Sequence, residues 1–83
     1  MKKLTPHLVV ALADAENAAY DTAAIAGDLL LAGWESRHKE VWQLWTRAEK
    51  AVRAIRRTDS LRIANRWRRI ARRCARTAHR LAI

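Results

Sequence analysis

The sequence predicts an all-α fold, a small antiparallel three-helix bundle formed by a single domain over residues 1–83. The first observation is composition: two glycines, one proline and no phenylalanine stand against abundant alanine, arginine and leucine, which favour helices. The second is that apolar residues recur at alternating spacings of three and four along nearly the whole chain. The third is that this register slips at Gly33 and again at 58–60, where turn residues lie.

The first helix is predicted at about residues 5–33. Thr5 is the expected N-cap, and Pro6 suits the first helical position, where its missing N–H costs nothing. The apolar seam of this helix comprises Leu4, Leu8, Ala11, Ala15, Ala18, Thr22, Ile25, Leu29 and Ala32. Acidic residues recur beside it every seven positions, at Asp14, Asp21, Asp28 and Glu35. The small residues predict close approach of a neighbouring helix, and Gly27 is expected to mark a close crossing.

The second helix is predicted at about residues 35–57, beginning at Ser36 or a nearby residue after the break at Gly33. Its seam comprises Trp34, His38, Val41, Trp45, Ala48, Val52 and Ile55. The third helix, at about residues 60–82, follows the cap and turn residues 58–60. Its seam comprises Ile63, Trp67, Ile70, Cys74, Thr77 and Leu81. Two alternatives stay open, a long bent helix from Ser36 to Leu81 and a helical hairpin assembly whose alanine-rich core is completed by homodimerisation.

The lone cysteine, Cys74, excludes an intramolecular disulfide and indicates a reducing compartment, so a cytoplasmic location is expected. No apolar run approaches the ~20 residues that a membrane span requires. A signal peptide is the alternative, because Met1-Lys2-Lys3 precedes an apolar stretch and an Ala13-Asp14-Ala15 site. The apolar stretch is short, however, and Pro6 interrupts its approach.

Charge is distributed unevenly between the two halves of the chain. Residues 1–35 contain two lysines against five acidic residues, a net charge of −3, and residues 36–83 contain fifteen Lys or Arg against three acids, a net charge of +12. One face of the third predicted helix carries arginine at spacings of 4-3-4-3-4: Arg62, Arg66, Arg69, Arg73, Arg76 and Arg80. Arg68 and Arg72 add two more cations, and the row spans about 27 Å at ~1.5 Å rise per residue.

This arginine row is interpreted as a binding surface for nucleic-acid backbone. Like charges at these spacings oppose the helix by about 2 kcal/mol in total, so an external anion would relieve them. Arginine favours bidentate phosphate contact, and only Asn65 lies nearby to contact base edges, which predicts sequence-tolerant binding to DNA or RNA. The alternatives are a solvated basic face, a face neutralised by the acidic row within the chain or between subunits of a homo-oligomer, and, more weakly, a membrane-surface helix.

The tryptophans are expected mainly in the core, except Trp42, which lies beside its seam and is a candidate interface anchor. His38 is expected to be a hydrogen-bonded core residue. The three histidines and Cys74 lack the spacing of metal ligands. The sequence therefore predicts no metal site, no cofactor, no small-molecule substrate, no catalytic residue and no enzymatic activity.

In size, helicity and lack of an active site, the chain resembles the small proteins that phages encode to block host factors, including anti-CRISPR and anti-activator proteins. The resemblance is one of general character over the whole chain and rests on no motif, so it implies no residue roles. It implies an alternative function, a protein–protein inhibitor or adaptor. In that case the arginine row would meet an acidic surface of a host protein, with Trp42 as the anchor.

Overall fold

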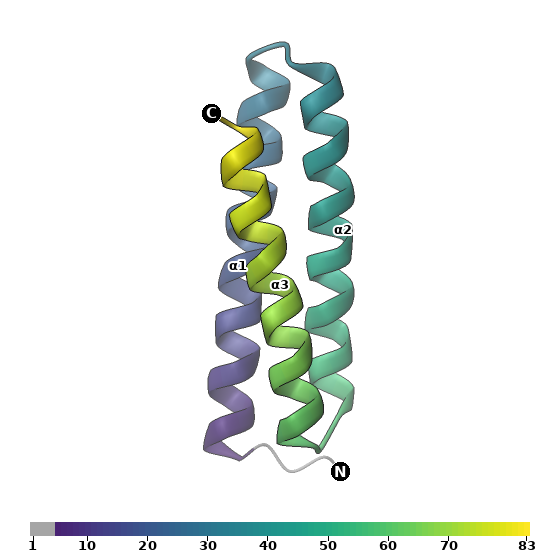
Figure 1. The fold of residues 1–83 in the computed structure, drawn as a ribbon. Coiled ribbons are helices and arrows are strands. Elements are labelled where there is room, and N and C mark those ends of the chain that lie inside the picture. The colour runs from purple at the N-terminus through teal and green to yellow at the C-terminus, as the bar shows by residue number, and fades with distance from the viewer. Residues whose placement is uncertain (1–4) are drawn as a thin grey trace.

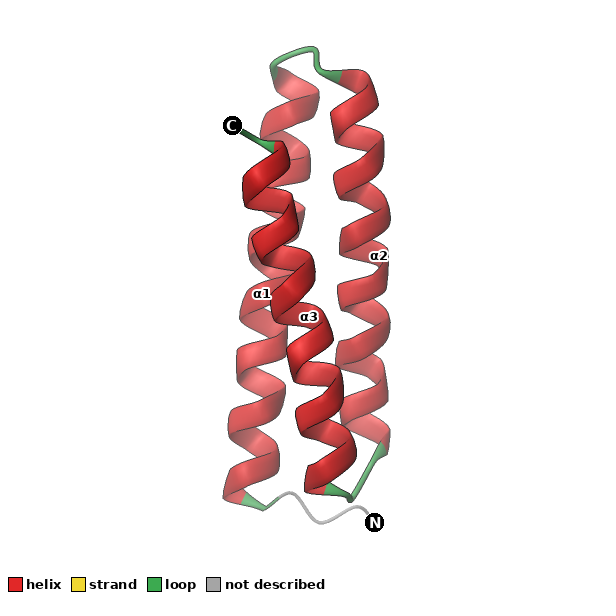
Figure 2. Cartoon of the chain, in the orientation of Figure 1, coloured by secondary structure: helices red, strands yellow, loops and turns green. Residues whose placement is uncertain are grey.

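The computed structural model describes residues 5–83, which form three helices: α1 (Pro6–Leu31), α2 (Glu35–Arg57) and α3 (Leu61–Leu81) (Figures 1 and 2). The expected ranges differ from these bounds by at most two residues. The described residues contain no strand. The expectations placed on Leu4 and on the charged start of a signal peptide, Met1-Lys2-Lys3, lie outside the described residues.

Successive helices run antiparallel, and each helix packs against the other two (Figure 1). The Cα trace measures 44 × 20 × 15 Å, a rod one helix length long. The all-α three-helix bundle predicted from the sequence is confirmed. The alternative of one long helix from Ser36 to Leu81 is wrong, because the chain leaves the helix at residues 58–60 and reverses direction there. The expectation that Gly27 marks a close crossing inside the bundle is also wrong, because a Cβ built at this position meets no atom within 4 Å.

Two of the three helices begin with a hydroxyl cap, as the sequence predicts. Thr5 Oγ1 accepts a hydrogen bond of 3.3 Å from the backbone N–H of Leu8 at the start of α1. Ser60 Oγ accepts a hydrogen bond of 3.3 Å from the backbone N–H of Ile63 at the start of α3. Each hydroxyl satisfies a backbone donor that the first turn of a helix leaves without a partner.

The turn between α1 and α2 depends on Gly33, whose φ is +79°. The backbone N–H of Trp34 donates to the carbonyl oxygen of Leu29 at 3.0 Å, which is the long bond of a Schellman motif and requires the left-handed conformation at the residue before it. Trp34 is the N-cap of α2 and makes no side-chain capping bond, and the helix begins at Glu35. Ser36 is thus inside the helix and is not its cap.

The predicted seam of α1 forms the centre of the core. The seam residues from Leu8 to Leu29 are all buried, and Ala32, at the end of the helix, is exposed. The one buried polar side chain among the described residues, Thr22, donates its hydroxyl to the carbonyl oxygen of Ala18 at 2.7 Å, so its burial leaves no unsatisfied donor. Four of the seven buried seam positions are alanine or threonine, which lets α2 and α3 lie close to α1.

The predicted seam of α2 is buried at Val41, Ala48, Val52 and Ile55. Trp45 is half-buried, and Trp34, expected in the core, is 46% exposed because it belongs to the turn. The buried alanines of α3 each come one residue after a predicted seam position: Ala64, Ala71, Ala75 and Ala78. Ile63, expected in the core, is 47% exposed. α3 contacts both other helices, so its buried face is centred on the small residues that fit between them, and its larger apolar side chains lie toward the edge.

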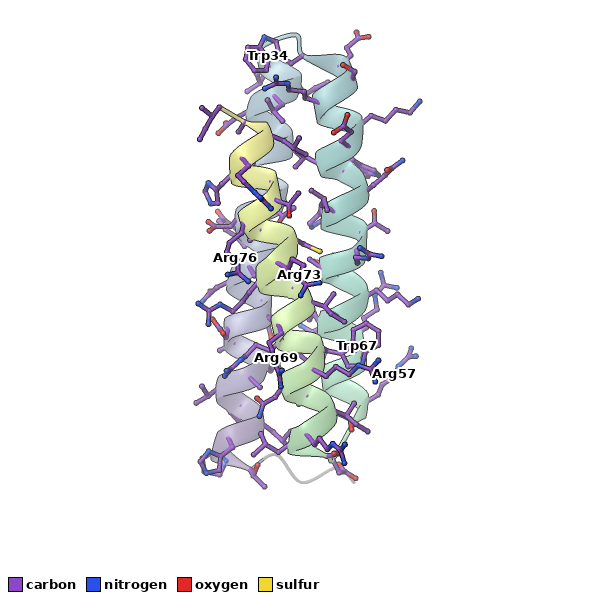
Figure 3. The ribbon with its side chains drawn as sticks, viewed as in Figure 1. Trp34, Arg57, Trp67, Arg69, Arg73 and Arg76 are labelled. Atoms are coloured by element: carbon purple, nitrogen blue, oxygen red, sulfur yellow. The ribbon has the colours of Figure 1, made fainter. Side chains whose placement is uncertain are left out.

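One contact that no sequence pattern predicts closes the end of the bundle. Arg37, in the first turn of α2, donates from Nη1 to the carbonyl oxygens of Leu81 at 2.8 Å and Ile83 at 3.1 Å. Its guanidinium carbon also lies 5.0 Å from the ring centroid of Trp34, which Figure 3 shows at this end. Arg37 therefore caps the C-terminus of α3 from the neighbouring helix.

Candidate functional site

The arginine row of α3 faces solvent along the whole helix. All six of its members, Arg62, Arg66, Arg69, Arg73, Arg76 and Arg80, are exposed. Within residues 5–83, none of the six forms an ion pair with an Asp or Glu side chain. Figure 3 shows Arg69, Arg73 and Arg76 along the side of α3 that faces away from the bundle. The row is thus an array of unneutralised guanidinium groups.

The acidic residues of α1 pair with the flank of α3 that lies beside α1, next to the row. Asp14 Oδ2 lies 3.5 Å from Arg68 Nε and 3.6 Å from Arg72 Nη1. Asp21 Oδ2 lies 3.6 Å from His79 Nε2, an ion pair only when the imidazole is protonated. The two cations expected to assist the row are therefore paired with a carboxylate of the same molecule, whereas in residues 5–83 no arginine of the row is.

Asp28 and Glu35, the other two acidic residues that recur every seven positions, do not reach α3. The pairs of Asp14 with Arg72 and of Asp21 with His79 share one offset, 72 − 14 = 79 − 21 = 58 residues. The same offset would require a partner at position 86 for Asp28, beyond the last helical residue of α3 at Leu81. In the part of the chain that the structure describes, neither Asp28 nor Glu35 forms an ion pair.

α2 contributes further cations to the same side of the molecule. A groove of about 580 Å³ between α2 and α3 is lined by Arg47 and Lys50 on one helix and by Trp67 and Arg73 on the other. An adjoining hollow is lined by Arg47, Lys50, Arg53, Arg57 and Trp67. Figure 3 shows Arg57 and Trp67 together at this edge. We call this surface, the arginine row of α3 together with these four cations of α2, the cationic face.

The sequence-based prediction of the site, which rests on the cations of the third helix, does not include these cations of α2. The spacing of Arg47, Lys50 and Arg57 by three and seven residues is helical and was available as a signal. The seam identifies the buried face of α2. It does not say whether α1 or α3 lies beside the flank that carries these cations, because that depends on how the three helices are arranged in the bundle.

Cys74 lines the groove but is only 3% exposed. Burial raises the pKa of its thiol, and the nearby charges of Arg47 and Arg73 oppose that rise without cancelling it. The thiol therefore stays protonated at neutral pH and behaves as a core residue, since the thiolate is the reactive form.

Trp42 lies on a different side of α2. Its indole is 50% exposed, and its ring centroid lies 4.6 Å from that of Trp45. Its other neighbour is His38, at 6.0 Å between centroids, and His38 Nδ1 donates to the carbonyl oxygen of Ala26 on α1 at 2.7 Å. Trp45 in turn lines a hollow formed with α1. This aromatic cluster follows the α1 side of α2, so the fold does not bring Trp42 together with the arginine row.

Within residues 5–83, no three His, Cys, Asp or Glu side chains gather as metal ligands would. No helix among these residues has both the length and the hydropathy to cross a bilayer. Comparison with known proteins found no matching family model, no matching curated protein and no matching solved structure.

Proposed function

We propose that this protein is a non-enzymatic binding protein whose cationic face contacts the phosphate groups of nucleic acid. The observation that supports this most directly is the exposure of the six arginines of α3 without an acidic partner in the described residues. Asp14 and Asp21 of α1 pair instead with Arg68, Arg72 and His79, on the flank of the same helix that lies beside α1. Arg68 and Arg72 act as internal partners of Asp14 and only secondarily as ligand contacts.

The side chains of the cationic face are better suited to contacting the phosphate backbone of a nucleic acid than to recognising its base sequence. Arginine holds phosphate oxygens in bidentate fashion, and no cluster of Asn or Gln side chains accompanies the row to contact base edges. Binding that is mostly ionic is tolerant of sequence and strongly dependent on salt. Both DNA and RNA present this backbone, so the proposal covers both.

The test is a titration of labelled duplex and single-stranded oligonucleotides, followed by fluorescence anisotropy at several salt concentrations. If the row neutralises six phosphates of a duplex, the logarithm of the binding constant falls against the logarithm of the salt concentration with a slope of about −5. No binding at low salt, or binding that ignores salt, overturns the proposal.

A pair of variants matched in charge separates a specific face from net charge. Arg69→Gln with Arg73→Gln removes two cations from the row. Arg56→Gln with Lys39→Gln removes two exposed cations elsewhere, of which Arg56 faces α1 and lies 3.6 Å from Glu16 Oε1. The first variant should lose affinity and reduce the salt slope by about 2, whereas the second should change both much less. Equal losses of affinity in the two variants would contradict binding through a defined face of the molecule.

The alternative partner is an acidic protein surface, and the half-exposed indole of Trp42 beside Trp45 is the observation that favours it. Because Trp42 and the arginine row lie on different sides, such a partner would have to wrap around α2. A pull-down from nuclease-treated lysate distinguishes the two proposals, since a specific partner retained after nuclease is a protein. We place either activity in the cytoplasm, in keeping with the unpaired Cys74 thiol.

A further inference from the structure

The hollows on the cationic face run into one another along the boundary between α2 and α3. The groove of about 580 Å³ shares three lining residues with the hollow on each side of it. Those residues are Arg47, Lys50 and Trp67 toward the end of α2, and Leu44, Arg47 and Thr77 toward its start. On α2 the lining extends from Glu40 to Arg57, which is about 26 Å at ~1.5 Å rise per residue. We call this continuous depression the long groove.

Apolar side chains form the bottom of the long groove. Leu44, Trp67 and Ile70 line it, are partly buried and pack against the hydrophobic core. Cys74, which is almost fully buried, lies among them. A surface that only attracted phosphate would need no apolar bottom, because charged oxygens gain nothing from packing against carbon. The long groove therefore suits a ligand that carries apolar surface as well as charge.

The rim of the long groove carries cations and little opposing charge. Five basic side chains line it, and all are exposed: Arg47, Lys50, Arg53, Arg57 and Arg73. Within residues 5–83, none of the five pairs with a carboxylate. Among the described residues that line the long groove, one is acidic, Glu40, and it belongs to the hollow that Trp67 does not line. The ligand that fits is therefore an anion, held between the centre of the groove and the end of α2.

Trp67 is placed to contact a flat ligand in this charged setting. Its indole lines both the groove and the hollow toward the end of α2, at the boundary of the two helices (Figure 3). Arg73 lines the same groove and also belongs to the arginine row, so a polyanion bound along the row can reach the indole. Single-stranded nucleic acid exposes the flat faces of its bases beside its phosphates, whereas a duplex stacks those faces inside. Proteins that bind single strands combine a positively charged groove with aromatic side chains on which bases stack.

We propose that the long groove binds single-stranded nucleic acid, with phosphates on the rim cations and a base stacked on the indole of Trp67. This proposal rests on the proposed function and specifies its ligand. Stacking tolerates any sequence, because every base has a flat face, so it agrees with the absence of side chains that recognise base edges. A duplex would contact the cations alone. An acidic amphipathic helix of another protein also combines charge with an apolar side, and the experiment includes it.

The experiment measures affinities by fluorescence anisotropy at one low salt concentration. The probes are a labelled oligothymidylate of about twelve nucleotides, an abasic strand of the same length and charge, and a duplex of that length. The wild-type chain should bind the oligothymidylate at least about fivefold more tightly than the abasic strand, because only bases can stack. Equal affinity for the two strands overturns the proposal and leaves phosphate binding intact. Failure to bind any of the three probes overturns the proposed function as well.

Trp67→Leu removes the indole and keeps an apolar side chain at the bottom of the long groove. It should weaken binding of the oligothymidylate by at least about fivefold and leave binding of the abasic strand and the duplex within about twofold. Trp42→Leu, which removes a half-exposed indole on the α1 side of α2, is the matched control and should change none of the three affinities. Circular dichroism of each variant checks that the helices form. The comparison of the two strands needs no variant and is decisive even if Trp67→Leu does not fold.

Three further outcomes overturn the proposal. The first is that Trp67→Leu weakens binding of all three probes alike, which indicates a structural role for the indole. The second is that Trp67→Leu and Trp42→Leu have the same effect on the oligothymidylate. The third is that the wild-type chain binds a labelled amphipathic helical peptide, with glutamates on one face and leucines on the other, more tightly than the oligothymidylate. That result would assign the long groove to a protein partner.

Discussion

Arg37 links two helix ends that lie 44 residues apart in sequence. The last turn of α3 leaves carbonyl oxygens without helical partners, and the guanidinium group of Arg37 binds the carbonyl oxygen of Leu81 and also the oxygen of Ile83 just past the helix, while adding a positive charge near the helix C-terminus. Sequence periodicity could not predict this contact, since it exists only when α3 ends beside the start of α2. His38, by contrast, was predictable as a hydrogen-bonded residue because it lies on the seam of α2.

Arg37→Ala should lower the free energy of unfolding by about 1 kcal/mol, because two hydrogen bonds from a charged donor are lost at a partly solvated site. Urea denaturation followed by circular dichroism measures the change. Lys39→Ala, an exposed cation two residues away, is the control and should change stability by less than about 0.5 kcal/mol. Equal effects of the two substitutions would rule out the capping role.

The helices differ in how well their buried faces could be predicted. The seam of α1 lies where the pattern places it, because apolar residues at these spacings alternate with clearly polar ones. On α3 two candidate seams run one residue apart, one of larger residues such as Ile63 and one of alanines such as Ala64. Hydrophobicity favours the larger residues, but the space between two closely packed helices accepts the smaller ones. The prediction was therefore displaced by one residue.

The displacement can be tested with one neighbouring pair of residues. Ala64→Leu inserts three carbon atoms where the side chain is fully buried and should destabilise the bundle by about 1–3 kcal/mol. Ile63→Ala removes three carbons from a half-exposed side chain and should cost less than about 1.5 kcal/mol, well below a typical core truncation. Urea denaturation of both variants gives the comparison. If Ile63→Ala lowered the free energy of unfolding more than Ala64→Leu does, the buried face of α3 would be the one expected from the sequence.

The two glycines provide a second test at the level of the helices. Gly33→Ala places a Cβ at a φ of +79° and should destabilise the turn by about 1 kcal/mol. Gly27→Ala, in a helical conformation with open space around the Cβ, should stabilise the monomer by up to about 1 kcal/mol. Thermal denaturation at one low protein concentration should give midpoints on opposite sides of the wild type. Shifts of the same sign would contradict the different backbone conformations assigned to the two glycines.

Across the whole molecule, charge is segregated between helices. The sequence predicts the asymmetry between the halves of the chain, but not which arginines the acidic heptad would reach. That depends on the alignment of α3 beside α1, which pairs Asp14 with Arg68 and Arg72 and leaves Asp28 past the end of α3. The absence of carboxylate partners along the row therefore depends on the helix lengths and on the offset of α3 relative to α1 along the bundle. The periodicity of the sequence predicts neither the offset nor the pairing that results from it.

Sodium chloride should stabilise this fold. Repulsion along α3 opposes the helix by about 2 kcal/mol at low salt, and the few surface ion pairs return less than about 1 kcal/mol each. Screening should therefore raise the midpoint of urea denaturation between low and physiological salt. Arg69→Gln with Arg73→Gln should show a smaller rise. A midpoint that falls with salt would mean that the ion pairs outweigh the repulsion.

The pairing of α1 carboxylates with only one side of α3 has a consequence for how the molecule moves. An acidic helix on one flank and unpaired guanidinium groups on the other give the rod an electric dipole moment across its width. Near any polyanionic surface, this moment produces a torque that turns the rod about its long axis before contact. Collisions are thus orientationally biased, with the acidic flank trailing.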